Sequence, residues 1–132
     1  MTHEITPNAF KTFIQKCRKY KKMFGLNDIE IYVTTDDLGD ENANATFSRS
    51  YTKGRLDIQL NENGIESNYG TKEKDLDYVA FHEIVEGGLL GELSILAGKD
   101  ASKSDEIEIE RACHAVVNRL WNIFNRKNES NS

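Results

Sequence analysis

The sequence predicts an α+β fold with a helix at the N-terminus, a small, mainly antiparallel sheet of three strands, and two further helices. Three observations support this class. Apolar residues recur at helical spacing near both ends of the chain, three segments between residues 28 and 60 alternate apolar and polar side chains, and an apolar run covers residues 79–90. We expect one domain over residues 1–132, with a core at about 7–125 and a frayed polar tail at 126–132.

The first helix is expected to begin at Thr6, because a threonine followed by proline is typical of an N-cap and a first helical position. Gly25 suits the position after a helix, so the helix should end near Phe24. The side of this helix opposite its apolar stripe carries basic side chains: Lys11, Lys16, Arg18, Lys19 and Lys22. This basic face could contact nucleic acid or an acidic partner, or be merely solvated, and the net charge of -5 argues against broad nucleic-acid binding.

Three segments have the two-residue period of half-buried strands. Residues 28–35 alternate isoleucine and valine with polar side chains. Residues 45–51 and 55–60 alternate in the same way, and the short turn between them contains a glycine. These last two segments therefore predict a β-hairpin. The polar stretches 36–44 and 61–70 are expected to be loops.

A second helix is expected to begin within residues 71–75 and to run to about residue 97. It contains three glycines: Gly87, Gly88 and Gly91. Each glycine inside a helix costs about 1 kcal/mol relative to alanine, so these positions need a reason. Either the glycines pack closely against a neighbouring helix, or they let another element approach the helix near Glu86.

A third helix follows the polar connector 98–104 and begins with Asp105 and Glu106, because acidic side chains are favourable in a first turn. Its apolar stripe consists of Ile109, Ala112, Cys113, Val116, Leu120, Ile123 and Phe124. Glu110 and His114 lie beside this stripe. They are four residues apart and therefore share one face of the helix.

The second helix carries three polar side chains within its apolar run: His82, Glu83 and Glu86. His82 and Glu86 are four residues apart, so they project from one face. A helix that is apolar on nearly all sides is buried, and an imidazole and two carboxylates buried without partners would be strongly destabilising. A bound metal ion would compensate these groups. The simpler alternative is an ion pair between His82 and Glu86 on a helix face.

The segment His82-Glu83-Ile84-Val85-Glu86 resembles the zincin signature, in which one helix carries two metal ligands one turn apart and the glutamate after the first ligand is the general base. More closely, the order of predicted elements resembles the minimal metallopeptidase-like proteins of bacteriophages, which are distantly similar to SprT-like proteases. The similarity covers about residues 10–124, and in that family the last helix brings a glutamate ligand. The resemblance implies a zincin-like fold and a metal-dependent peptidase acting on a protein or peptide.

The resemblance also implies a role for individual residues. His82 would be the first metal ligand, Glu83 the general base, and Glu86 and Glu110 the second and third ligands. His114, one turn after Glu110, would be a supporting partner or an alternative ligand. A zinc ion with three protein ligands keeps one position for water and lowers its pKa to about 7, and Glu83 would accept the proton of that water.

Glu86 departs from the usual zincin pattern, which has histidine at that position. One imidazole and two carboxylates would suit manganese or another hard divalent ion better than zinc. Alternatively, His114 binds the metal directly, or the chain is a catalytically inactive binding module with a structural or absent metal. A two-metal carboxylate site is a further reading, since two helices each offer a glutamate and a histidine. Three other side chains could stabilise an oxyanion: Tyr69, Tyr78 and Arg111.

Composition favours a soluble cytoplasmic protein, in a host cell if the chain is phage-encoded. Hydrophobic residues make up 38% of the chain and charged residues 30%, which is typical of a globular domain rather than a disordered one. No apolar run reaches the roughly 18 residues of a membrane span, and the N-terminus has no secretory pattern, so we expect no membrane partner. Cys17 and Cys113 lie on apolar helix faces, as expected for reduced core thiols.

Overall fold

A computed structural model describes residues 6–38, 45–50, 53–62, 73–99 and 102–130. Its elements, in chain order, are α1 (Pro7–Met23), β1 (Glu30–Asp36), β2 (Ala45–Ser50), β3 (Arg55–Asn61), α3 (Glu73–Glu83), η2 (Ile84–Leu89), α4 (Gly91–Gly98) and α5 (Lys103–Ser130). A helix, a small sheet and then further helices confirm the predicted α+β class. Most of the two predicted loops, 36–44 and 61–70, lies outside the described residues.

The three strands form one mixed sheet in the order β1-β3-β2. β2 and β3 pair antiparallel, with Ala45 opposite Leu60, which confirms the predicted hairpin. β1 lies on the other side of β3 and runs parallel to it, with Ile31 opposite Leu56. Only one of the two pairings is therefore antiparallel. Among the described strands β2 pairs with β3 alone, so the outer edge of β2 has no strand beside it.

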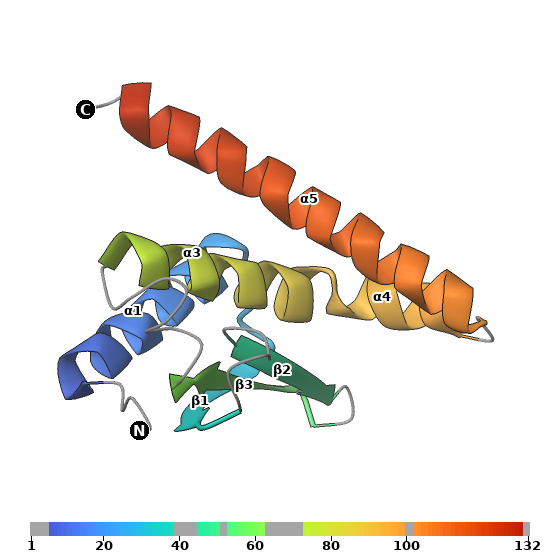
Figure 1. The fold of residues 1–132 in the computed structure, drawn as a ribbon, viewed down its shortest axis with the longest axis horizontal. Coiled ribbons are helices and arrows are strands. Elements are labelled where there is room, and N and C mark those ends of the chain that lie inside the picture. The colour runs from blue at the N-terminus through green and yellow to red at the C-terminus, as the bar shows by residue number, and fades with distance from the viewer. Residues whose placement is uncertain (1–5, 39–44, 51–52, 63–72, 100–101, 131–132) are drawn as a thin grey trace.

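The core lies between the sheet and the helices. In Figure 1, α3, η2 and α4 follow one another between the sheet and α5, which crosses them obliquely. Every second side chain of β3 is fully buried, and these side chains belong to the same core cluster as the buried side chains of α1 and α3: Phe13, Cys17, Leu56, Ile58, Leu60 and Phe81. Phe81 and Ile84 flank His82 and Glu83 in the sequence and are themselves fully buried. The predicted motif is therefore anchored directly to the core.

Both predicted ends of α1 are confirmed. The side-chain oxygen of Thr6 accepts a hydrogen bond from the backbone N–H of Ala9 at 3.2 Å, as an N-cap residue does. Gly25 has a φ of 69°, the left-handed conformation that glycine adopts most easily after a helix. On the basic face Lys11, Arg18, Lys19 and Lys22 are exposed and Lys16 is partly buried. A partner for this face stays a prediction.

Tyr20 links α1 to α3, because its hydroxyl donates a hydrogen bond to Asp77 Oδ1 at 2.5 Å. Burial of the ring and this bond raise the pKa of the phenol above its usual value of about 10. We expect Tyr20→Phe to lower the free energy of unfolding by about 1 kcal/mol at pH 7. The folded state favours the neutral phenol, so the difference from wild type should shrink as pH rises above about 10. Urea unfolding at pH 7 and pH 10.5 would measure both effects, and a pH-independent difference would contradict the assignment.

The predicted second helix is interrupted. Between α3 and α4 the chain forms η2, a π-helical segment of a kind found frequently at functional sites. The glycines allow close packing here, since a Cβ at Gly87 would lie 2.9 Å from Leu56 Cδ1 and one at Gly88 would lie 2.7 Å from Leu26 Cδ1. The close neighbours are therefore side chains of the sheet and of the segment before it, rather than another helix. They approach η2 beside Glu86.

We expect Gly87→Ala to lower the free energy of unfolding by about 1 kcal/mol. An added methyl group would clash with Leu56 and Phe47, which costs about 1–3 kcal/mol, and the better helix propensity of alanine offsets only part of that. Gly98→Ala is the matched control, because nothing lies within 4 Å of a Cβ at Gly98. The control should be neutral or slightly stabilising. Equal effects of the two substitutions on urea unfolding would argue against close packing at Gly87.

α5 is longer than predicted. It continues to Ser130, through most of the segment expected to be a frayed tail. Trp121 and Phe124 pack against the ring of Phe81, with centroid distances of 5.1 and 5.5 Å. These aromatic contacts attach α5 to α3, and the N-terminal part of α5 packs along α4.

Both cysteines are free thiols, as predicted. Cys17 is buried in the core and Cys113 is partly buried on α5. Among the described helices, none is both long enough and apolar enough to cross a lipid bilayer.

Candidate metal centre

The site is built on the turn where α3 passes into η2. His82 is in the last turn of α3 and Glu86 is in the first turn of η2. Their spacing of four residues places both side chains on one side of this continuous helical segment. His82 Nε2 lies 2.7 Å from Glu86 Oε2. The pair predicted from the sequence is therefore in direct contact.

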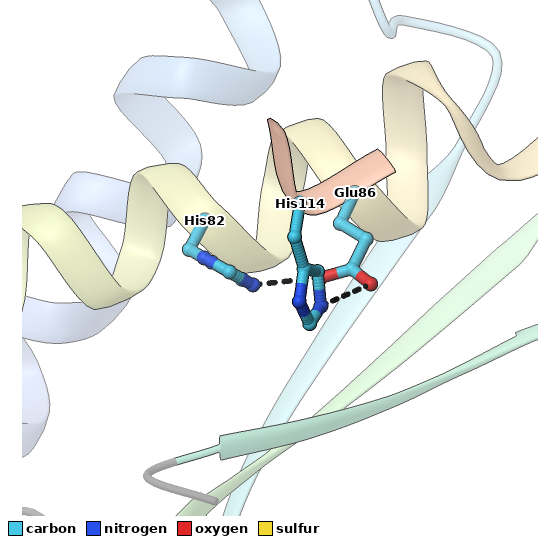
Figure 2. Close-up of side chains that lie close together, drawn as sticks. All are labelled: His82, Glu86 and His114. Carbon is cyan, nitrogen blue, oxygen red and sulfur yellow. Dashed lines mark ion pairs between the residues drawn. The ribbon is translucent and has the colours of Figure 1, made fainter. Parts of the chain in front are cut away.

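His114 of α5 completes the group. Figure 2 shows its ring extending from α5 toward the same carboxylate. His114 Nε2 lies 2.9 Å from Glu86 Oε1, and the two imidazole centroids are 5.1 Å apart. The carboxylate of Glu86 therefore lies between two imidazoles that come from helices distant in the sequence.

This arrangement could hold a metal ion. One nitrogen of each histidine and one carboxylate oxygen of Glu86 all lie within 4.8 Å of one another. The side chain of Glu86 is 12% exposed and those of His82 and His114 are 20% and 43% exposed, so the group opens to solvent on the His114 side. Two imidazoles and one carboxylate form a donor set that also occurs at catalytic zinc sites. Tetrahedral zinc ligands at about 2.0–2.1 Å lie roughly 3.4 Å apart, so small side-chain rotations would bring these donors into range.

Glu83 lies next to this group and is nearly fully buried, with 6% of its surface exposed. Its Oε2 atom has no hydrogen-bond partner among the described residues. Burial, and to a lesser degree the nearby Glu86 carboxylate, raise the pKa of Glu83 well above its usual value. A buried carboxylate oxygen without a partner is unfavourable for stability alone, which points to a role toward a bound group.

These side chains face a cavity of about 600 Å³. Its lining comes from the start of β2, from α4 and from α5, which we call its walls, and from the helical segment that carries the motif, which we call its base. The lining residues are Ala45, Thr46, Phe47, Tyr78, Val79, His82, Glu83, Glu86, Ser94, Gly98, Glu106, Ile109, Glu110, Cys113 and His114. The possible metal ligands and the edge strand β2 therefore line the same cavity.

The structure brings together three of the predicted ligands: His82, Glu86 and His114. Glu110, expected as the third ligand, is exposed on the cavity wall and does not belong to the group of converging donors. His114, the alternative ligand predicted from the sequence, has a nitrogen among the three converging donors instead.

The three oxyanion candidates differ in position. Tyr78 lines the cavity, its ring contacts that of His82 with centroids 6.1 Å apart, and its hydroxyl donates to Asn118 Oδ1 at 3.2 Å. Arg111 is exposed and does not line the cavity. Tyr69 lies outside the described residues.

Several cavity residues were not predicted from the sequence. Phe47 of β2 and Ile109 and Glu106 of α5 are among them. A signal existed for Glu106, because Glu106, Glu110 and His114 repeat at a spacing of four and must share one face of a helix. No comparable signal links Phe47 to the site, because its position depends on how the sheet packs below η2.

Comparisons with protein-family models, with curated proteins and with solved structures gave no match. Function is therefore inferred from the chemistry and geometry of the side chains.

Proposed function

We propose that this protein is a zincin-like, metal-dependent peptidase in which His82, Glu86 and His114 bind one divalent ion and Glu83 is the general base. The observation that carries the proposal is the convergence of two imidazoles and a carboxylate beside a buried carboxylate with an unpaired oxygen. The cavity that these groups line is open to solvent and large enough to admit part of a peptide.

His114 is the preferred third ligand, since its nitrogen lies 2.9 Å from Glu86 whereas Glu110 is outside the converging group. With His114 the donor set has two imidazoles and one carboxylate, which suits zinc better than the one-imidazole set that includes Glu110. Zinc is therefore the proposed metal, with manganese as the next candidate.

When bound, the ion would act as a Lewis acid toward a water molecule and toward the carbonyl oxygen of the substrate. Glu83 would accept the proton of the attacking water and transfer it to the leaving amine. Glu83 follows His82 directly and lines the base of the same cavity, and burial among core residues restricts its side chain. Tyr78 lines the cavity one turn before His82, and its hydroxyl would have to exchange its hydrogen bond to Asn118 for one to the substrate to stabilise the developing oxyanion.

The substrate would bind as an extended chain along β2. Extended peptides commonly pair with an exposed sheet edge, and the outer edge of β2 has no neighbour among the described strands. Ala45, Thr46 and Phe47 belong both to this strand and to the cavity wall. A peptide paired with β2 would therefore pass directly beside Glu83 and the proposed metal ligands.

The alternative function is a non-catalytic binding module. One observation favours it: the two carboxylate oxygens of Glu86 lie within 2.9 Å of His82 Nε2 and His114 Nε2, so the three side chains form a network that links α3 and η2 to α5. If that network or a structural ion were its only role, the fold rather than a reaction would depend on it.

Metal analysis combined with chelation distinguishes the two functions. We expect purified, untagged protein to contain about one zinc ion per chain by mass spectrometry. Dialysis against a chelator should abolish cleavage of an unfolded, fluorescently labelled protein substrate while the circular-dichroism signal of the helices persists. Zinc added back should restore cleavage. Unfolding on chelation, or an intact chain that binds zinc and cleaves nothing, would favour the binding module.

A further inference from the structure

Acidic side chains predominate among the charged residues that are described as lining the cavity. Among the residues that the structure describes, its lining includes four glutamates, Glu83, Glu86, Glu106 and Glu110, and neither a lysine nor an arginine. Glu83 and Glu86 lie at the base, where a bound divalent ion would offset the charge of the Glu86 carboxylate. Glu106 and Glu110 lie on the α5 wall, are exposed, and form no hydrogen bond or ion pair through their side chains with any described residue. No described basic side chain therefore neutralises their charge.

The two wall glutamates are arranged in a row that leads to the metal centre. Glu106, Glu110 and His114 are separated by four residues each, so they lie one above the other along one face of α5. At a rise of about 1.5 Å per residue, Glu110 is about 6 Å and Glu106 about 12 Å from His114 along the helix. In an extended peptide, side chains on one face are about 6.6–6.8 Å apart. The spacing of Glu110 and Glu106 along α5 is therefore close to the spacing of successive side chains on one face of a bound extended peptide.

A second observation points to a ligand in this cavity, independent of the wall glutamates. Glu83 is nine-tenths buried, lines the cavity and has an oxygen with no partner among the described residues. Glu106 and Glu110 therefore border a cavity whose base contains a buried carboxylate oxygen without a described partner. They are not an isolated patch of surface charge. Low-dielectric walls strengthen the field that such charges exert on a ligand.

We propose that Glu106 and Glu110 determine substrate specificity by selecting peptides with a lysine or arginine side chain close to the bond that is cut. This inference rests on the proposed function, because it assigns a substrate class to the same cavity. A basic side chain two residues from the reacting carbonyl would reach Glu110, and one four residues away would reach Glu106. An acidic side chain at either place would be repelled, which adds to the discrimination.

Binding can be measured separately from cleavage. The protein would be the zinc-loaded Glu83→Gln variant, so that no bond is cut. The probes are fluorescein-labelled decapeptides that differ only by lysine, glutamine or glutamate at two central alternate positions, and the readout is fluorescence anisotropy. We expect the lysine peptide to bind at least about tenfold more tightly than the glutamine peptide, with the advantage falling as salt is raised.

In the same background, Glu106→Gln with Glu110→Gln should remove most of this preference. The matched control is Glu108→Gln with Asp28→Asn, which removes the same charge from exposed positions that do not line the cavity. The control should keep the preference. Equal binding of the three peptides, a preference that survives the wall substitutions, or an equal loss in the control would each overturn the inference. Thermal melting and zinc titration of each variant would establish that fold and metal binding are retained.

Cleavage of the same peptides by protein that retains Glu83 tests the underlying function. Cleavage that favours lysine and loses that preference in the wall variant supports both proposals. Cleavage without a lysine preference supports the proposed peptidase function and contradicts the role of Glu106 and Glu110 in substrate specificity. A lysine preference in binding with no cleavage of any peptide retains the role of the wall glutamates and contradicts the peptidase.

Discussion

Replacing Glu83 with glutamine is expected to lower the rate of peptide hydrolysis by about 100- to 10,000-fold, because glutamine cannot accept the proton of the attacking water. The substitution preserves the size of a side chain that is almost completely buried. Zinc content should be unchanged, since Glu83 does not belong to the converging donors. Hydrolysis would be followed with a quenched-fluorescence peptide under single-turnover conditions.

A loss of activity in Glu83→Gln identifies the general base only if this variant keeps its fold and its metal. Circular dichroism, the melting temperature and zinc content would be compared with wild type, and Glu108→Gln on the solvent side of α5 serves as a control with unchanged activity. A Glu83→Gln protein that keeps its zinc and cleaves peptides at the wild-type rate would contradict the assignment of Glu83 as the general base.

His114→Ala is expected to remove the metal, whereas Glu110→Ala is expected to leave it bound. His114 Nε2 is part of the donor group, and Glu110 lies on the same helix face one turn away without joining it. Loss of a direct ligand should weaken binding by more than the roughly 10–100-fold that follows from loss of a supporting side chain. Competition between the protein and a fluorescent zinc chelator would give both dissociation constants.

His82→Ala provides the positive control, because His82 is a proposed ligand whether His114 or Glu110 is the third. The reverse outcome, with zinc retained by His114→Ala and lost by Glu110→Ala, would restore Glu110 as the third ligand. It would also mean that α5 shifts along its axis on metal binding, since Glu110 lies on the same helix face as His114 but about 6 Å away along the helix.

Features that depend on residues close together in the sequence could be predicted from it. The cap at Thr6, the left-handed Gly25 and the hairpin all depend on short-range preferences, and the structure has each of them. The direction of β1 was not predictable in this way. Its alternation fits a parallel or an antiparallel neighbour equally, and the choice depends on which strand β1 pairs with, which is a property of the tertiary structure.

The candidate site was predictable in part for the same reason. The contact between His82 and Glu86 follows from helical spacing alone. Glu110 and His114 also share a helix face, so spacing could not decide which of them meets Glu86. That choice depends on how far α5 is shifted along α4 and η2, which is a property of tertiary packing. The interruption at η2 was missed because its apolar residues fit an α-helix and a π-helix equally well.

Because the metal donors come from two helices, binding of an ion would also stabilise the folded state. An ion held by both Glu86 and His114 would close a loop of chain that contains all of α4, a helix whose outer side chains Leu93, Ile95 and Leu96 are exposed. Loop closure removes conformational freedom from the enclosed segment. At a free ion concentration 100 times the dissociation constant, binding would add about 2.7 kcal/mol to the stability of the folded state. Amide hydrogen exchange in α4 should therefore slow when zinc is added, and the ion would help to hold the cavity wall that α4 provides.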